Sequence, residues 1–202
     1  MDLMAVMIRC FMEKKREIID KLIGKIYPVS EEGRQKLSDV LVSFYLEKGD
    51  YFLREGQVCK YICFVERGMV RQFYNKGNRD LTEHFTYENG LFICLESFFK
   101  QIPSYLQVEV LESSLIYALP HDAFMQLVRE IPEIHYLYSG ILENCLIISQ
   151  QKADASRFET AHERYNRLLS EHPEVVKRAP LIYIASYLGM TPETLSRVRA
   201  GT

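Results

Sequence analysis

The sequence lacks the features that would assign it at once to a membrane, a secretory route or a strongly basic nucleic-acid-binding class. No apolar run approaches the length of a membrane-spanning helix, and the N-terminal apolar stretch after Asp2 is too short for export. The net charge is only −2, with 25 Lys and Arg against 27 Asp and Glu, so composition gives no global sign of a polyanionic partner. We therefore expect a cytoplasmic protein with an ordinary core, built as one large domain or two small ones.

The sequence is also poor in clustered cysteine and histidine. The odd number and scattered spacing of the cysteines exclude a disulfide framework and favour a reducing compartment. Only Cys10 lies near the N-terminus, so four thiolates cannot be gathered there for an iron–sulfur cluster. Cys59 and Cys63 are expected on one side of a strand, but they are weak candidates for zinc ligands because the sequence lacks the second pair of ligands that a zinc site needs. The five cysteines are Cys10, Cys59, Cys63, Cys94 and Cys145.

One possible function is that of an enzyme with a cupin-like metal site inside a β-roll. Such a site needs two histidines two residues apart, a nearby glutamate and a further histidine. Here His84 follows Glu83 alone, and nothing in the sequence supports His84, His121 or His135 as a haem ligand. We therefore expect no catalytic residue and no metal site.

Hydrophobic patterning predicts helices at both ends of the chain and strands between them. Helical spacing favours helices over 11–27 and 31–45. From 46 to about 120, short runs rich in aromatic and β-branched residues alternate with turns, and "NKGN" at 75–78 predicts a hairpin. Helices return after Pro120. The fold class is therefore α+β, with an antiparallel β-roll or jelly roll whose expected turn glycines are Gly49, Gly56, Gly68, Gly77 and Gly90.

A proline-free stretch of about 26 residues, from 133 to 158, predicts one long helix. Its apolar residues recur at intervals of three and four, which is typical of a coiled-coil seam. A long helix with one apolar seam needs a partner, and we expect a symmetric homodimer. The alternative is that the same face packs on the roll of its own chain. The seam residues are Ile134, Leu137, Ile141, Cys145 and Ile148.

The C-terminal segment predicts two short helices joined by a tight turn. A helix starting near Pro180 ends at Gly189, and Thr191 caps the next helix with Pro192 at its first position. Two helices joined by a three-residue turn with glycine form a helix-turn-helix. We expect the space between them to be filled by Ile184, Leu188, Met190, Leu195 and Val198.

This arrangement leaves one polar face of the last helix outside the core. Residues near the start of such a helix enter the DNA major groove, while its cap and flanking cations suit phosphates. Residues 151–202 carry eight Lys and Arg against six Asp and Glu, and within 178–202 only Glu193 opposes Arg178, Arg197 and Arg199. This small basic end favours an anionic partner. The expected DNA-binding residues are Thr191, Glu193, Thr194, Ser196, Arg197 and Arg199.

Two motifs resemble the Crp/Fnr superfamily of transcription regulators. "IASYLGMTPETLSRVR" at 184–199 resembles the family's DNA-binding signature, and "LEKGDYFLREGQVCKYICFVERGMVRQFY" at 46–74 resembles the opening of its effector barrel. Gly49, Gly56 and Gly68 match the barrel glycines, and Gly90 matches the glycine before the ligand cassette. The resemblance runs from about residue 20 to the end.

The resemblance implies a cyclic-nucleotide-binding-domain-like β-roll (a double-stranded β-helix), a long dimerisation helix and a helix-turn-helix. The corresponding units are 1–131, 132–157 and 158–202. It implies a homodimeric regulator that binds double-stranded DNA and works with RNA polymerase. By the same resemblance Glu193 and Arg197 occupy base-reading positions, with Ser196 between them on the same face.

The sequence departs from the family pattern at two places. Pro192 replaces an arginine common in the family, so the usual half-site is in doubt. The chain ends at Thr202, directly after the recognition helix, so we expect a short form without the family's C-terminal wing, either natural or truncated. Both departures keep open an alternative function: a β-roll that binds a small molecule or a protein partner, with a weakened or lost DNA-binding end.

The cassette argues against cyclic AMP as the effector. Cys94 and Leu95 stand at the family's Gly-Glu positions, and Ser104 or Tyr105 stands at the position of its phosphate-binding arginine. Lys100 is the only basic residue of the cassette, and a buried phosphate without a cation is unfavourable. We expect no cofactor and, if the pocket is open, an apolar or aromatic ligand; otherwise the aromatics simply fill the roll. The expected pocket residues are Leu95, Phe98, Phe99, Ser104 and Tyr105.

Overall fold

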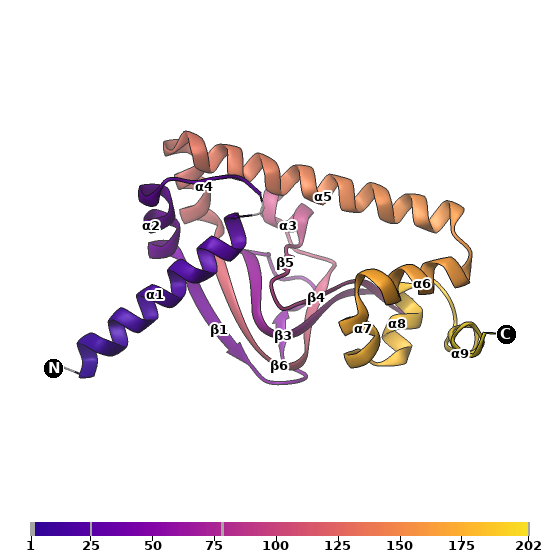
Figure 1. The fold of residues 1–202 in the computed structure, drawn as a ribbon. Coiled ribbons are helices and arrows are strands. Elements are labelled where there is room, and N and C mark those ends of the chain that lie inside the picture. The colour runs from indigo at the N-terminus through magenta and orange to yellow at the C-terminus, as the bar shows by residue number, and fades with distance from the viewer. Residues whose placement is uncertain (1–2, 25, 78, 202) are drawn as a thin grey trace.

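A computed structural model describes residues 3–24, 26–77 and 79–201, with side chains from residue 12 onward. In this part of the chain one antiparallel sheet has the strand order β1-β6-β3-β4, while β2 also pairs with β6 and β5 with β3 (Figure 1). The α+β class predicted from the sequence is confirmed. The strands are β1 (Val42–Leu46), β2 (Tyr51–Leu53), β3 (Tyr61–Lys76), β4 (Arg79–Tyr87), β5 (Leu91–Phe92) and β6 (Gln107–Pro120).

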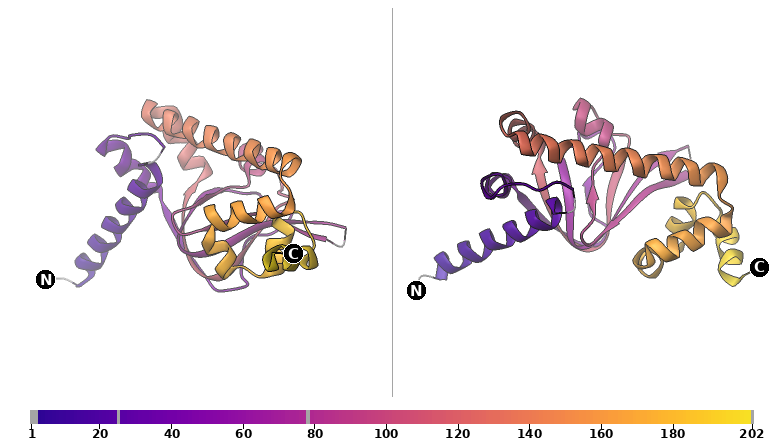
Figure 2. Two further views of the ribbon diagram at one scale, coloured as in Figure 1. Left: turned by 45° about the vertical axis from the view of Figure 1, so that its right-hand side comes forward. Right: turned by 45° about the horizontal axis from the view of Figure 1, so that its top comes forward.

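Helices lie at both ends of the roll, and one long helix spans its length. Helices α1, α2 and α4 gather at one end, α6 to α9 gather at the other, and α5 runs along the roll between them (Figures 1 and 2). No helix in the described ranges is both long and apolar enough to cross a bilayer. The helices are α1 (Leu3–Ile23), α2 (Glu31–Val40), α3 (Leu95–Lys100), α4 (His121–Glu130), α5 (Pro132–Phe158), α6 (Ala161–Glu171), α7 (Pro173–Arg178), α8 (Leu181–Tyr187) and α9 (Pro192–Ala200).

The N-terminal helices differ from the predicted ranges. The first ends at Ile23 instead of residue 27, and the second ends at Val40 instead of residue 45. Residues 42–46 form strand β1, in which Phe44 pairs with Ile116 of β6. The β-branched and aromatic residues of this stretch suit a strand, and pairing with β6 satisfies its backbone groups.

Two long strands replace four of the predicted short ones. Strand β3 runs through Gly68 without a turn. Strand β6 is likewise continuous through Ser113, where the short apolar runs predicted two strands. The pairing of β3 with β6 shifts register beside Gly68, whose φ of 101° is accessible mainly to glycine. Gly68 therefore makes a bulge instead of a strand end, whereas the predicted hairpin between β3 and β4 is confirmed for its described residues.

The apolar side chains form two clusters. The larger lies between the roll and the helices α1, α2, α4 and α5, with Phe64, Phe98 and Phe124 fully buried in it. The smaller joins the C-terminal helices to Met69 on β3. This second cluster fixes the C-terminal helices on the far end of the roll.

Replacing Gly68 with alanine should destabilise the protein strongly. A Cβ at this position would lie 2.7 Å from the Ser114 Cβ, and the left-handed backbone adds strain, so we expect a loss of about 2–3 kcal/mol in the free energy of unfolding. Gly77→Ala is the matched control, because Gly77 also has positive φ but no neighbour within 4 Å. Urea denaturation measures both variants, and equal losses would show that the contact with Ser114 is unimportant.

Candidate DNA-binding surface and effector pocket

Helices α8 and α9 form the predicted helix-turn-helix. The Met190 N–H donates to the Ala185 carbonyl at 3.0 Å, and Gly189 reverses the chain with φ 64°. The side chains between the two helices are buried except for the partly buried Met190, as expected from their spacing. The buried residues are Ile184, Ala185, Leu188, Leu195 and Val198.

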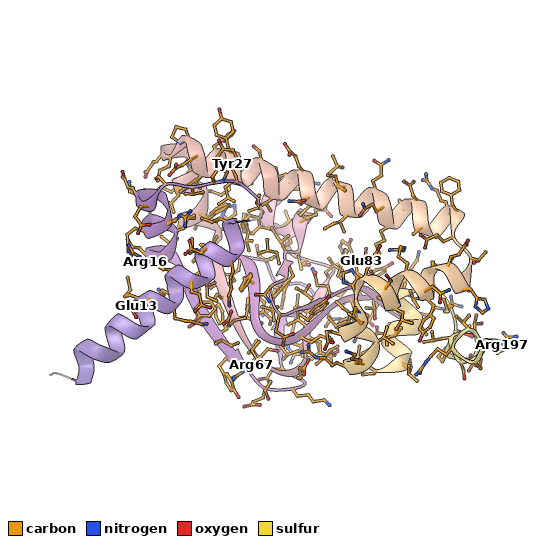
Figure 3. All side chains as sticks on the ribbon, viewed as in Figure 1. Glu13, Arg16, Tyr27, Arg67, Glu83 and Arg197 are labelled. Carbon is orange, nitrogen blue, oxygen red and sulfur yellow. The ribbon has the colours of Figure 1, made fainter. Side chains whose placement is uncertain are left out.

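The start of α9 is capped as predicted, and its polar face is exposed. The Thr191 hydroxyl accepts a hydrogen bond from the Thr194 N–H at 3.2 Å. A hydrogen bond from its own N–H, followed by one from Thr191, lowers the pKa of Glu193, so this residue carries a negative charge at neutral pH. Arg197 points outward at the C-terminal end of the molecule (Figure 3). Thr194 is half-buried, and the other expected DNA-binding residues are exposed: Thr191, Glu193, Ser196, Arg197 and Arg199.

Arg164 of α6 supports the turn between the two helices. Its Nε donates to the Leu188 carbonyl at 2.9 Å, and its Nη1 donates to the Glu159 carbonyl at 2.6 Å. It thereby satisfies a carbonyl at the end of α8 and fastens the start of α6 to it. The role of Arg164 was not predicted, because no local pattern marks an arginine that binds distant carbonyls. Helix α7, of six residues, was not predicted either.

The C-terminal helices dock along strand β4 and onto the middle of β3. The Arg71 guanidinium of β3 lies 3.5 Å from the ring centre of Tyr183 in α8 and 3.9 Å from that of Phe73. The same guanidinium pairs with Asp80 at 2.5 Å and with Glu109 at 2.8 Å. Arg71 is only 1% exposed, so this cation is buried with its partners where the C-terminal helices meet the roll, a region called the junction below.

Further polar contacts close the junction. The Ser186 hydroxyl of α8 accepts from the Thr82 N–H and donates to the Asp80 carbonyl, both at 2.9 Å. On α5, the Lys152 ammonium donates to the backbone and side-chain oxygens of Glu83. Strand β4 lies at the edge of the sheet, and these contacts provide hydrogen-bond partners for backbone groups on its open side.

Arg178 belongs to the same junction and not to the exposed basic surface suggested by its sequence position. It pairs with Glu88 at 2.7 Å and with Glu112 at 2.5 Å, both on the roll. Burial works most strongly against ionisation of Glu88, but hydrogen bonds from Arg178 and from the Gly68 N–H outweigh it and lower the pKa of Glu88 to about 2. The basic end of the chain is thus reduced to Arg197 and Arg199.

The five residues expected to line an effector pocket do not come together. Phe98 is fully buried in the core, and the buried Ser104 hydroxyl is occupied by both backbone groups of Leu106. Tyr105 is 56% exposed. Leu95 and Phe99 line a common groove, whereas Phe98 and Ser104 are buried, so the five residues do not all face one open pocket as predicted.

Leu95 and Phe99 line a groove of about 460 Å³ between α3 and α5, together with Leu142, Cys145 and Leu146. The groove also includes Glu96, Lys100 and Ser149, and Lys100 pairs with Glu96 at 2.8 Å. Its walls are mainly apolar, and the side chain of Leu146 is 70% exposed.

The predicted apolar seam of α5 divides between core and surface. Ile134, Leu137 and Ile141 are buried in the core of their own chain, Cys145 is half-buried, and Ile148 is 51% exposed. The expectation that all five form an intermolecular seam is therefore wrong. The first three follow the alternative, in which the helix packs on its own roll, because spacing alone does not tell an internal partner from an external one.

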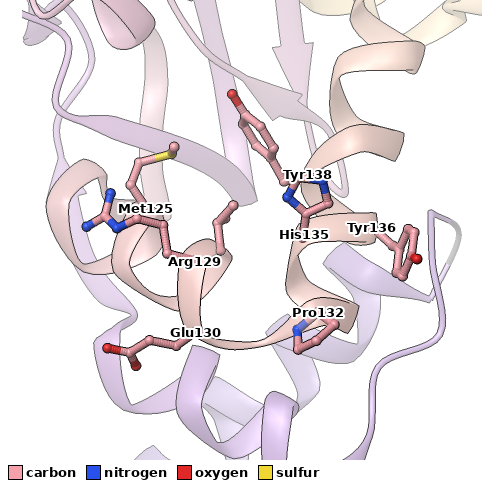
Figure 4. Close-up of a pocket in the computed structure, with 8 residues that line it drawn as sticks. Met125, Arg129, Glu130, Pro132, His135, Tyr136 and Tyr138 are labelled. Atoms are coloured by element: carbon pink, nitrogen blue, oxygen red, sulfur yellow. The ribbon is translucent and has the colours of Figure 1, made fainter.

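A second cavity, of about 540 Å³, lies at the elbow between α4 and α5 (Figure 4). Met125, Arg129, Glu130, His135 and Tyr138 are among the residues that line it. None of the cassette residues named by the sequence is among its lining residues, but the Tyr138 ring packs edge to face against Phe99 of the cassette at 6.0 Å.

Within the described residues, no three His, Cys, Asp or Glu side chains come together as metal ligands. Burial and then the nearby Lys152 lower the pKa of His84 to about 4, so this histidine is neutral at pH 7. The Cys10 side chain lies outside the described residues. Cys59 lies before strand β3, where its thiol donates to the Tyr61 carbonyl at 3.5 Å, and Cys63 lies within the strand, so the two cysteines do not share one strand as expected.

Comparisons with known proteins agree with this architecture. Residues 43–131, from β1 through α4, match the family model of the cyclic nucleotide-binding domain. No curated protein matches the sequence.

Several solved structures share the fold. FixK2 of Bradyrhizobium japonicum is 22% identical with a TM-score of 0.68, covering 80% of this chain and 84% of its own. A Eubacterium rectale protein ascribed to the Crp/Fnr family of transcriptional regulators is 13% identical with a TM-score of 0.67, covering 86% and 83%. The c-di-GMP-responsive regulator CLP of Xanthomonas campestris is 15% identical with a TM-score of 0.65, covering 85% and 91%. The resemblance to Crp/Fnr proteins is thus confirmed as a shared fold.

The ion pair between Glu88 and Arg178 should give the protein an acid-sensitive junction. Because the folded-state pKa of Glu88 is below its ordinary value of 4.5, its contribution to stability is complete above about pH 4.5 and is lost as the pH falls toward about 2. Arg178→Gln should flatten this acid limb, as measured by urea denaturation at several pH values. Lys177→Gln is the control, since Lys177 pairs only with Glu174 at the surface. Equal acid limbs in both variants would contradict the assignment.

Proposed function

We propose that this protein is a sequence-specific DNA-binding transcription regulator of the Crp/Fnr type that acts as a homodimer. The division proposed for the chain is an effector unit over 1–131, a long dimerisation helix over 132–157 and a DNA-binding unit over 158–202. RNA polymerase is its expected partner at the promoter. The Crp/Fnr fold supports the regulator class, and the residues below support the finer assignment.

The observation that carries the proposal is the polar face of α9. Its apolar side chains are used in packing against α8, while Glu193, Ser196 and Arg197 lie exposed on the helix. An arginine can bind guanine edges at two atoms, and a glutamate can accept from cytosine. Thr191 and Arg199 flank this face and suit phosphate contacts. In this mechanism α9 enters the major groove, and α8 supports it from behind.

A second copy of the chain is proposed to bind along α5 with a seam shifted by one residue from the predicted one. Leu142, Leu146, Ser149 and Ala153 recur at intervals of four, three and four on the side of α5 that opens onto the groove with α3. The exposed Leu146 is explained if it packs in the partner's groove. For two-fold pairing of α5 to serve two adjacent half-sites, the two α9 helices must lie roughly 34 Å apart, which is one turn of DNA.

Cyclic AMP is not the proposed effector. The Ser104 hydroxyl at the position of the family's arginine is already paired with Leu106, and Lys100, the only basic residue of the cassette, is paired at the surface with Glu96. A cyclic phosphate placed there would be buried without a cation. The groove between α3 and α5, which the second copy is proposed to fill, is not assigned to an effector.

Selection of bound sequences from a random pool of double-stranded DNA tests the proposal as a whole. We expect a two-fold-symmetric sequence, since two identical readers face the duplex. Enrichment without symmetry would contradict the homodimer. The absence of any salt-dependent binding would favour the alternative of a ligand- or partner-binding roll without DNA contacts.

Arg197→Ala should weaken binding to the selected DNA by about 1–3 kcal/mol and relax specificity at one base pair of each half-site. The reason is the loss of two hydrogen bonds to a base edge. Gel-shift titration measures the affinity. Arg16→Ala is the control, because Arg16 is exposed at the opposite end of the molecule (Figure 3). Unchanged affinity in Arg197→Ala would contradict the base-reading role.

Leu146→Asp should convert the dimer to a monomer, since it places a charge in the proposed seam. Light scattering after gel filtration gives the mass of each variant. Ile147→Asp is the matched control: Ile147 is 53% exposed but does not line the groove, so its variant should remain dimeric. A dimer in both variants would place the interface elsewhere.

A further inference from the structure

The cavity at the elbow between α4 and α5 is large enough for a small organic molecule. Its volume of about 540 Å³ falls within the range of about 300–1000 Å³ that is usual for small-molecule sites. Met125 and Arg129 of α4 lie on one side of it, and His135 and Tyr138 of α5 lie on the other (Figure 4). The seam and the DNA-reading face proposed above use none of these side chains, so they are available for another role.

The inner walls of the cavity are apolar and are held in place by the core. On α4, Val128 is only 7% exposed, and Met125 is half-buried. On α5, the centre of the Tyr138 ring lies 6.2 Å from that of Phe124 and 6.0 Å from that of Phe99, both edge to face. A thioether and a tyrosine ring are both favourable neighbours for an aromatic ring. These walls therefore suit a flat aromatic group.

An arginine without an ionic partner lines the same cavity. Arg129 is exposed, and no carboxylate in the described ranges forms an ion pair with it. The one acid among the lining residues is Glu130, whose carboxylate instead accepts a hydrogen bond from the Gln126 amide at 2.8 Å. An arginine binds a carboxylate through two parallel hydrogen bonds. A phosphate dianion would bring a second negative charge next to Glu130, so the charges favour a monocarboxylate.

We propose that the elbow cavity binds a small aromatic monocarboxylate, which acts as the effector of the regulator. The aromatic ring lies between Val128 and Tyr138, and the carboxylate pairs with the Arg129 guanidinium. Binding removes the apolar walls from water and gives Arg129 the ionic partner that the described part of the chain does not supply. The effector role rests on the proposed function, whereas the binding site does not.

A ligand at this place acts on α5 in two ways. A single residue, Ile131, ends α4 and precedes α5, so the angle between the two helices is set at one position. A ring inserted between the helices changes that angle. In addition, Tyr138 touches Phe99, which lines the groove that receives the second copy in the proposed dimer. The ligand therefore changes how the two copies pair, and with it the affinity for DNA.

Titration with 2-naphthoate, an aromatic monocarboxylate, tests the site in the full-length protein. The chain contains no tryptophan, so light of longer wavelength than tyrosine absorbs excites only the probe, and its fluorescence anisotropy reports binding. 2-Naphthamide is the uncharged control of the same shape. We expect 2-naphthoate to bind at least about tenfold more tightly than 2-naphthamide, because hydrogen bonds between charged groups contribute that much.

Three results of this titration would contradict the proposal. Equal affinities for 2-naphthoate and 2-naphthamide would overturn the pairing of the carboxylate with Arg129. Tighter binding of 2-naphthyl phosphate than of 2-naphthoate would overturn the choice of a monocarboxylate. No binding of any of the three probes would overturn the site itself.

A charge variant assigns the binding to the elbow cavity. Arg129→Gln should abolish the preference, so that both probes bind with the affinity of 2-naphthamide. Arg54→Gln is the matched control, because Arg54 is also exposed and lies 4.0 Å from the ring centre of Tyr51, but on the roll. This control should keep the preference. An unchanged preference in Arg129→Gln, or its loss in Arg54→Gln, would overturn the proposal.

Val128→Phe tests the apolar wall. The larger side chain occupies the space of the ligand ring, so both probes should bind at least about tenfold more weakly, which corresponds to the burial of about two methylene groups. Thermal melting checks that the variant is folded, and Met125→Phe, at a half-buried position of the same wall, replaces it if it is not. Unchanged affinity for both probes would place the ring elsewhere and overturn the site.

Gel shift on the selected DNA tests the effector role. We expect saturating 2-naphthoate to change the DNA affinity of the wild-type protein at least about fivefold, the lower end of typical coupling, and to leave that of Arg129→Gln unchanged. Binding of the probe without a change in DNA affinity would overturn the effector role and leave the site standing. A protein that binds the probe but no DNA in either state would overturn the proposed function instead.

Discussion

The buried guanidinium of Arg71 is the interaction on which the arrangement of the two halves depends. It is a full positive charge removed from water, and such a charge is tolerated only when its partners surround it. Two carboxylates, a hydroxyl and two aromatic rings do so, and they come from β3, β4, β6 and α8. The C-terminal helices must therefore sit where Tyr183 covers the cation, and separating them from the hairpin would expose or unpair that charge.

Apolar contacts act together with this charge at the same place. The C-terminal helices have a small core of their own around Leu168 and Ile184, and Met69 extends it onto the roll. Around Met69, the partly buried side chains of Phe85, Tyr87 and Leu111 also pack against this core, and ion pairs such as that of Arg178 with Glu88 flank them. The C-terminal helices are therefore held on the roll both by apolar packing and by the buried charge.

Patterns that depend on local geometry could be predicted from the sequence. The helix-turn-helix, its Thr191 cap and the hairpin near Gly77 follow from turn chemistry and helical spacing within a few residues. The predictions were wrong where pairing with a distant strand decides the local structure. Residues 42–46 fit a helical pattern but pair with β6, and Gly68 marks a bulge because β6 continues past it.

The candidate functional surfaces also divide into those that local residues determine and those that distant contacts determine. The exposed face of α9 could be deduced because its core neighbours are local. The side of α5 that packs on the roll could not be deduced, since it depends on contacts between segments far apart in the chain. Arg178 shows the limit most clearly: its sequence position placed it in the small basic end of the chain, and its spatial neighbours are the carboxylates of Glu88 and Glu112.

The β3–β4 hairpin belongs to the sheet of the roll and also contacts α8 through Arg71, Asp80 and Thr82. Bending or twisting of that hairpin therefore costs energy that depends on how the C-terminal helices are held. By thermodynamic linkage, a ligand of the roll that favours one hairpin shape changes the affinity for whatever α9 binds, and α9's occupant changes the affinity for the ligand by the same factor. A tight DNA site would then sensitise or desensitise the roll to its own signal, so that each operator sets a different response threshold.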